Sequence, residues 1–197
     1  MTAMSTPYEL TGRTRQKART RAALLAAARE LLAEGGSATV EQAADRADVS
    51  RTTAYRYFAN RRDLLLAVYP EIESASLLGP DAPDDPAARL DLVTGRIGSQ
   101  LLDHEPELRA MLRLSLEPGA TDLPLRQGRA IRWIEDALAP LRGRMSRREL
   151  RRLVLAIRAT IGIEPLVWLT DVAGLSREEA VDVMRSSART LLEAALR

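Results

Sequence analysis

Apolar residues recur at helical spacing along most of the chain. In the segment 14–34, one helical face carries five of them: Leu24, Leu25, Ala28, Leu31 and Leu32. Gly35 and Gly36 follow this segment, and a glycine directly after a helix is a frequent stop because it adopts a left-handed conformation. Val, Ile and Thr form no alternating runs of the kind that predict strands. The pattern therefore predicts an all-α fold.

Polar residues mark the expected starts of the helices. Thr39, Ser146 and Ser176 are each followed three positions later by Gln or Glu, the spacing of a capping box. Asp85 and Pro86 are typical of an N-cap and a first helical residue. With the apolar periodicity, these signals predict helices at 14–34, 40–47, 51–58, 60–77, 86–104, 106–117, 123–141, 147–171 and 176–196.

The segment Thr39–Leu66 predicts a helix-turn-helix, because two short helices are joined there by a tight turn. Small side chains in the first helix, such as Ala43 and Ala47, allow the second helix to approach. The turn needs a residue that tolerates positive φ, and Asp48 is among the few non-glycine residues that do.

The second short helix, 51–58, has two different faces. Ala54 and Phe58 are four residues apart and are expected to point inward. The outward face then shows arginine, threonine and tyrosine side chains, which suit base edges and phosphate oxygens: Arg51, Thr52, Thr53, Tyr55, Arg56 and Tyr57. Arg61 begins the following helix and can add a positive charge beside a phosphate. A basic but merely solvated amphipathic helix is the alternative.

Composition and charge narrow the possible functions. Among the 197 residues there is no cysteine and only one histidine, His104, which excludes disulfides, thiol nucleophiles and histidine-cage metal sites. Residues 1–64 carry eleven basic and seven acidic side chains, whereas the remaining residues carry eighteen basic and twenty acidic ones. A basic N-terminal third on a nearly neutral body favours a polyanion-binding module attached to a second domain.

No apolar run approaches the length of a membrane-spanning helix, so we expect no membrane partner. The first ten residues lack the apolar stretch of a signal peptide. The expected location is the cytoplasm.

At this point the chain resembles the TetR (tetracycline-repressor) family of bacterial transcription regulators. The resemblance spans about residues 14–68 and rests on Ala33-Glu34-Gly35, Thr39-Val40, the turn Ala47-Asp48-Val49-Ser50, Tyr55-Arg56-Tyr57-Phe58, Asn60 and Leu64-Leu65. The chain departs from the family pattern at four positions, where the family usually has an aromatic residue, Gly, Leu and Pro: Gly36, Asp48, Ala54 and Ala59.

The resemblance implies an all-helical homodimer with a flexible N-terminus at 1–12, a helix-turn-helix domain at 13–60 and a helical effector-binding and dimerisation domain at 61–197, whose first helix is a connector. It places three side chains against base edges: Arg51, Thr52 and Arg56. It places five against phosphates: Thr39, Thr53, Tyr55, Tyr57 and Arg61. The basic segment Arg13–Arg19 either contacts the DNA backbone or minor groove or is a solvated tail.

The two long C-terminal helices, near 147–171 and 176–196, carry wide apolar stripes. By resemblance these helices pair with their copies in a dimer interface, although such stripes also form ordinary cores. A twofold dimer would bind a near-palindromic operator, because two recognition helices about 34–36 Å apart fit successive major grooves.

An effector site is expected among unusual side chains on the C-terminal helices: His104, Met111, Trp133, Arg158, Glu164 and Trp168. Arg158 and Glu164 interrupt an apolar stretch, and an internal salt bridge is the alternative to a ligand role. Pro165 is expected to kink or unwind its helix. Only carboxylates or His104 could serve catalysis, and the paired acids Asp84 and Asp85 lie in a proline-rich loop where they are typical of a helix cap. Because no segment resembles a phosphate-binding loop or a dinucleotide motif either, we expect neither an enzyme nor a cofactor or metal.

The function predicted from the sequence is sequence-specific DNA binding by a transcriptional regulator. Its most direct form is a repressor that a small-molecule effector releases from a palindromic operator. A DNA-binding activator, or an architectural dimer without an effector, is the alternative.

Overall fold

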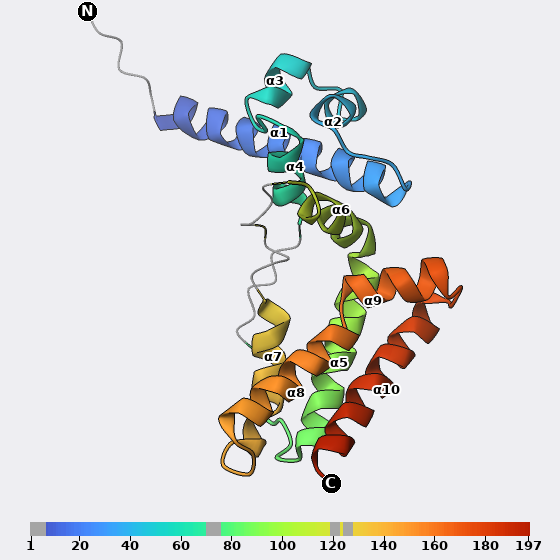
Figure 1. Ribbon diagram of the computed structural model, residues 1–197. Helices are drawn as coiled ribbons and strands as arrows, with labels where there is room; N and C mark the ends of the chain where they lie inside the picture. Colours follow the sequence, from blue (N-terminus) through green and yellow to red (C-terminus); the bar gives the residue numbers. More distant parts are fainter. Residues whose placement is uncertain (1–6, 70–75, 119–122, 124–127) are drawn as a thin grey trace, which may run out of the picture. The chain divides into compact units, whose positions relative to one another are not determined.

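The computed structural model describes residues 7–69, 76–118, 123 and 128–197 (Figure 1). Nearly all described residues are helical and none lies in a strand, which confirms the all-α prediction. The chain divides into two compact units, Met1–Pro70 and Glu71–Arg197. The N-terminal unit holds α1 (Pro7–Ala33), α2 (Val40–Arg46), α3 (Arg51–Tyr55) and α4 (Arg61–Val68). The C-terminal unit holds α5 (Pro86–Asp103), α6 (Glu105–Ser115), α7 (Arg129–Ala137), η2 (Ala139–Leu141), α8 (Arg147–Thr160), α9 (Ile163–Val167), η3 (Trp168–Val172) and α10 (Arg177–Ala195).

Local signals fix the helix ends of the N-terminal unit as predicted. Gly35 has φ of 78°, and the amides of Gly35 and Gly36 donate to the carbonyls of Leu32 and Leu31, which ends α1 in a Schellman motif. Thr39 and Gln42 form the predicted capping box at the start of α2. These caps satisfy backbone groups that a helix end would otherwise leave without partners.

The N-terminal unit differs from the prediction at both ends. α1 begins at Pro7, so residues 7–12 are helical where a flexible end was expected, and residues 1–6 lie outside the described residues. The compact unit ends at Pro70 rather than at residue 60, because α4 packs against α1 through Leu64, Leu65 and Val68. α4 itself ends at Val68 instead of continuing to residue 77, since a residue that precedes a proline avoids the helical conformation.

In the C-terminal unit, α5 packs against α7 and α10, and α10 also packs against α8 (Figure 1). Asp91 on α5 accepts hydrogen bonds from Arg185 and Arg189 on α10 at 3.0 and 2.9 Å. Buried apolar side chains from several helices form the core, among them Val93, Ile134 and Met184. The helix predicted at 123–141 is shorter: α7 starts after Gly128, and η2 holds Pro140 beyond its end.

The helix predicted at 147–171 is broken. α8 ends at Thr160, Ile161 is extended, and Gly162 has φ of 148°, a value that side chains rarely allow. The proline ring at Pro165 would clash with the carbonyl of Ile161 if the helix were continuous. Instead, Pro165 lies in the first turn of α9, where its missing N–H is tolerated, and the predicted kink is confirmed as a full break.

By length and composition alone, one helical stretch among the described residues could cross a membrane. Within Arg147–Val172, an 18-residue window meets that test, so the expectation that no stretch would do so is wrong. Of this window, 44% is buried inside the protein, and the core helix of a soluble protein passes the same test. Ile157 and Leu166, on either side of the break, are fully buried.

Candidate DNA-binding surface

The turn between α2 and α3 has the predicted geometry. Asp48 has φ of 51°, the only positive value at a non-glycine among the described residues, and Val49 N–H donates to the carbonyl of Ala44 at 2.9 Å. Ser50 caps α3, because its hydroxyl accepts from the Thr53 amide at 3.3 Å. The turn therefore presents α3 as the second helix of a helix-turn-helix.

α3 has an inward and an outward face. Ala54 and Phe58 are 0% and 3% exposed, as predicted. Arg51, Thr52 and Arg56 are exposed to solvent. α3 is shorter than the predicted 51–58, because the amides at 56 and 57 turn back to carbonyls three residues earlier. The expected base-contacting side chains thus lie on a free surface of the unit.

The five expected phosphate-binding residues differ from one another in solvent exposure. Tyr55 is 43% exposed, whereas the other four are half-buried: Thr39, Thr53, Tyr57 and Arg61. The hydroxyl of Thr53 accepts from the Ser50 hydroxyl at 2.8 Å, and that of Thr39 caps α2. Two of these hydroxyls therefore already organise the helix starts.

Acidic side chains of α2 hold two of the outward groups in place. Arg51 donates to Asp45 at 3.1 Å, and Tyr55 donates to the carboxylate of Glu41. This hydrogen bond lowers the pKa of Glu41 and raises the pKa of Tyr55, and the bond with Asp45 raises the pKa of Arg51. Exposed pairs of this kind contribute about 0–1 kcal/mol. They can therefore exchange their partners for a DNA duplex at small cost.

Two further contacts fix α1 against the rest of the unit. Arg46 at the end of α2 donates to both carboxylate oxygens of Glu34, at 2.8 and 2.9 Å, and reaches Glu30 at 3.5 Å. The Arg21 guanidinium lies 5.7 Å from the centre of the Phe58 ring. Sequence reasoning missed these contacts, because residues 12 to 37 positions apart give no periodic signal.

The basic segment Arg13–Arg19 forms part of α1 rather than an extended arm. Residues 14–19 are exposed, while the side chain of Arg13 lies outside the described residues. A contact with DNA by this segment would therefore involve a helical face.

The predicted effector residues have different environments in the C-terminal unit. Met111 and Trp133 are buried, at 1% and 6% exposed, whereas Trp168 begins η3 and is 56% exposed. His104 is half-buried between α5 and α6 and donates no side-chain cap. Their role in binding an effector stays a prediction.

Arg158 and Glu164 face each other across the break between α8 and α9. Arg158 donates to Glu164 at 3.3 Å and to the carbonyl of Ile161 at 2.8 Å. The alternative of an internal salt bridge is therefore present in the structure. Together with the bond to the Ile161 carbonyl, this pair links the end of α8 to the start of α9.

The comparisons with known proteins agree with this surface. Residues 24–68 match the family model of bacterial regulatory proteins of the tetR family. The chain is similar to the crystal structure of a TetR transcriptional regulator from Rhodococcus sp. RHA1, with 21% identity over 88% of this chain and 96% of that chain and a TM-score of 0.54. A TetR-family transcriptional regulator from Streptomyces coelicolor is 23% identical over 92% of this chain and 99% of that chain, with a TM-score of 0.47. No curated protein matches the chain.

The resemblance to the TetR family is thereby confirmed. It holds in sequence over the helix-turn-helix domain, and the first of the two solved structures shows that the fold of the chain is the same.

Proposed function

Starting from this tetR-type domain, we propose that the chain is a transcriptional repressor in the cytoplasm that binds a near-palindromic operator as a homodimer. A small-molecule effector releases it by favouring an arrangement of the two domains that no longer matches the groove spacing. The observation that carries the proposal is the exposed set of Arg51, Thr52 and Arg56 on a capped recognition helix. We propose no catalytic step.

The charges on α3 suit a division between base and phosphate contacts. Arg51 and Arg56 have the bidentate geometry that recognises guanine, while the hydroxyls of Tyr55 and Tyr57 suit phosphate oxygens. Asp45 and Glu41 hold Arg51 and Tyr55 before DNA arrives. Binding therefore starts from side chains that are already ordered, which reduces the entropy cost of ordering them.

The dimer is proposed to form through α8, η3 and α10. The apolar stripes predicted on these helices are mostly core, since Val154, Ile157 and Met184 are buried. A second apolar set on the same helices faces solvent: Leu155, Trp168, Val172 and Val183 are 43, 56, 71 and 40% exposed. Exposed large apolar groups on helices that pack together favour an interface between copies.

A DNA titration tests the proposal directly. Duplexes from the chain's own promoter are titrated with the protein, and the double variant Arg51→Ala/Arg56→Ala is expected to bind at least about tenfold more weakly. The matched control is Arg144→Ala/Arg152→Ala, which removes the same charge from exposed positions at the start of the C-terminal α8 region. Equal weakening of DNA binding by the two double variants would show that DNA affinity depends only on the net charge of the protein.

The dimer has its own test by sedimentation. Leu155→Glu is expected to produce monomers, since it puts a charge in the proposed interface. Leu92→Glu on α5 is the control, because Leu92 is equally exposed at 45% but lies outside α8, η3 and α10. A monomeric wild-type protein would contradict the proposed assembly.

A further inference from the structure

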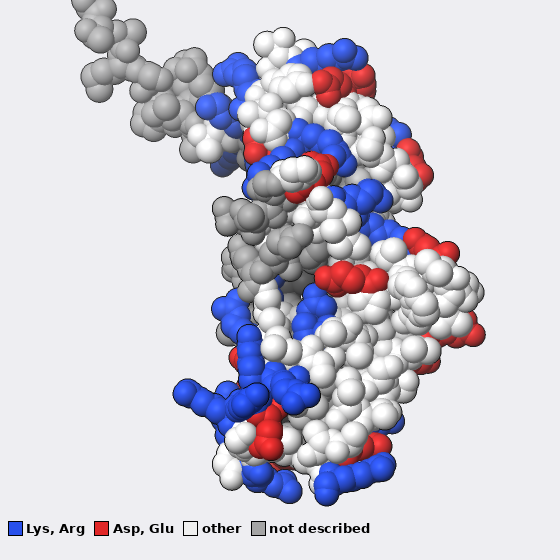
Figure 2. Space-filling model, in the orientation of Figure 1, with Lys and Arg blue, Asp and Glu red and all other residues white. Residues whose placement is uncertain are grey.

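The segment 142–152 holds an unusual concentration of arginine. Six of its eleven residues are arginine: Arg142, Arg144, Arg147, Arg148, Arg151 and Arg152. Figure 2 shows Lys and Arg side chains gathered over the region where α8 begins. Because a run of like charges is often only a solvated face, its acidic partners and its shape decide whether it can form a site.

The two nearby acidic residues, Glu135 and Glu149, already have hydrogen-bonding partners. Glu149, the only acid in the segment, completes the capping box of α8, with its carboxylate accepting from the Ser146 amide at 2.9 Å. Glu135 on α7 pairs with Arg151 at 2.6 Å. Neither Arg142 nor Arg147 forms an ion pair with any residue that the structure describes. Two guanidinium groups that line the same pocket thus have no acidic partner among the described residues.

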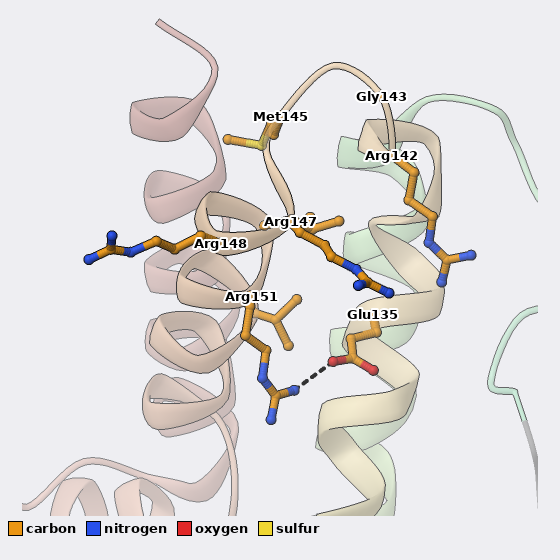
Figure 3. A pocket seen from close by; sticks show the side chains of 9 residues that line it. Glu135, Arg142, Gly143, Met145, Arg147, Arg148 and Arg151 are labelled. Carbon is orange, nitrogen blue, oxygen red and sulfur yellow. Dashed lines mark hydrogen bonds and ion pairs between the residues drawn. The ribbon is translucent and has the colours of Figure 1, made fainter.

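These arginines surround a pocket between α7 and the start of α8. The pocket has a volume of about 860 Å³, and Figure 3 shows Arg142 and Arg147 extending on its α7 side while Arg148 extends to the opposite side. Its apolar lining comes from Met145, Leu150 and Val154, of which Val154 is fully buried. The volume lies in the range of small-ligand sites, about 300–1,000 Å³.

The two parts of the lining point to one kind of ligand. Guanidinium groups bind carboxylates and phosphates with strong, charge-assisted hydrogen bonds, often in pairs. The Ser146 hydroxyl already accepts from the Glu149 amide at the start of α8, and the guanidinium groups supply the positive charge for this binding. Burial of a hydrocarbon group against the apolar lining contributes favourable binding free energy, whereas a bare inorganic ion has no apolar surface to bury.

We propose that this arginine pocket, defined by Glu135, Arg142, Met145, Arg147, Leu150, Arg151 and Val154, binds an amphiphilic anion. The ligand is an apolar body that carries one carboxylate or phosphate head group. Arg142 and Arg147 bind the head group, and Met145 and Leu150 cover the apolar part. Arg151 keeps its pair with Glu135, which holds α7 and α8 together below the head group. This site contains none of the predicted effector residues and does not depend on DNA binding.

Calorimetric titrations of the full chain, without DNA, test the proposal. The probes are decanoate, decyl phosphate, decanol and inorganic phosphate. One of the two alkyl anions is expected to bind at least about tenfold more tightly than decanol and inorganic phosphate, because only it uses both parts of the lining. The tighter alkyl anion identifies the head group as carboxylate or phosphate.

Two charge-matched variants locate the site. Arg142→Gln/Arg147→Gln is expected to weaken binding of that alkyl anion by at least about tenfold, because it removes the head-group contacts. Arg144→Gln/Arg152→Gln removes the same charge from arginines outside the pocket lining, and is expected to weaken binding less than about twofold. Circular dichroism verifies that both variants are folded.

Three results would overturn the proposal. Equal weakening by the two variants would show general attraction of anions to the basic surface. Inorganic phosphate binding as tightly as decyl phosphate would exclude an apolar contribution. Displacement of the alkyl anion by a random duplex that binds wild type and Arg51→Ala/Arg56→Ala equally would assign the arginines to a nucleic acid.

Discussion

Two groups of arginines, one in each unit, differ in their partners. Near α3, Arg46 and Arg51 have acidic partners on neighbouring helices at 2.8 and 3.1 Å, whereas near the start of α8, Arg142 and Arg147 have none among the described residues. In the N-terminal unit, these pairs order side chains on an exposed surface. In the C-terminal unit, the unpaired Arg142 and Arg147 line a pocket that also has an apolar lining. At these four arginines the presence or absence of an acidic partner therefore distinguishes the two surfaces, whereas positive charge alone does not.

Other acidic residues of the C-terminal unit form ion pairs with arginines outside the segment 142–152. Glu105, which is buried, pairs with Arg109 at 2.7 Å and with Arg177 at 2.5 Å. Arg109 also binds Asp171 on η3 at 2.6 Å. These pairs connect α6, η3 and α10, so these acids stabilise helix packing and are not available to Arg142 and Arg147.

The largest expected effect tests whether the two units are separate. Leu64→Ala and Leu166→Ala each remove a fully buried side chain, one from each unit, and each should cost about 2–5 kcal/mol of unfolding free energy. Hydrogen exchange should show the loss of protection mainly in the unit that carries the change. Equal loss throughout the chain after either substitution would contradict the division at Pro70.

A smaller effect is expected where α5 and α10 approach most closely. A Cβ at Gly98 would lie 2.7 Å from Cγ1 of Val181, so Gly98→Ala should destabilise the C-terminal unit by about 1–3 kcal/mol despite its higher helix propensity. Val181→Ala in the same chain should restore most of this stability. Thermal unfolding of the two single variants and the double variant checks the coupling, and strictly additive effects would disprove the close contact.

A substitution in the turn between α2 and α3 should instead raise the unfolding free energy of the N-terminal unit. Asp48 has φ of 51°, which glycine adopts without strain, so Asp48→Gly should stabilise that unit by up to about 1 kcal/mol. Asp48→Val should destabilise it by a similar or larger amount. Denaturant unfolding measures both variants. A destabilising glycine would mean that the Asp48 side chain supports the turn.

The smallest effect concerns pH. The hydrogen bond from Arg109 lowers the pKa of Asp171 to about 2, below its ordinary value. This contribution is therefore complete above the unfolded pKa and is lost as the pH falls toward 2. Because Asp171 is half exposed, it amounts to less than about 1 kcal/mol. Unfolding curves at pH 6 and pH 2.5 should differ less in Asp171→Asn than in the wild type, and equal differences would contradict the assignment.

Local signals explain what the sequence allowed us to predict. The caps at Thr39, Ser146 and Ser176 and the turn at Asp48 depend on residues at most three positions apart, and all have the predicted geometry. The inward side chains of α3 followed from the same short spacing. Elements that local chemistry determines can thus be predicted from one sequence.

Longer-range features were mostly missed. The break between α8 and α9 was expected at Pro165 but lies at Ile161 and Gly162, where the proline ring would meet the preceding turn. The pairs between Arg46 and Glu34 and between Arg109 and Asp171 join separate helices, so no periodicity predicts them. The arginine run at 142–152 is visible in the sequence, but its shortage of acidic partners and its apolar lining appear only in the fold.

Selection of bound sequences from a random duplex library tests the central claim most directly. The wild-type protein should enrich a twofold-related pair of half-sites about one helical turn apart or a multiple of it. The variant Arg51→Ala should lose the base preference at matching positions in both half-sites. The control Arg144→Ala/Arg152→Ala should enrich the same DNA sequence as the wild-type protein. An unchanged sequence preference after Arg51→Ala/Arg56→Ala would contradict recognition of DNA by α3.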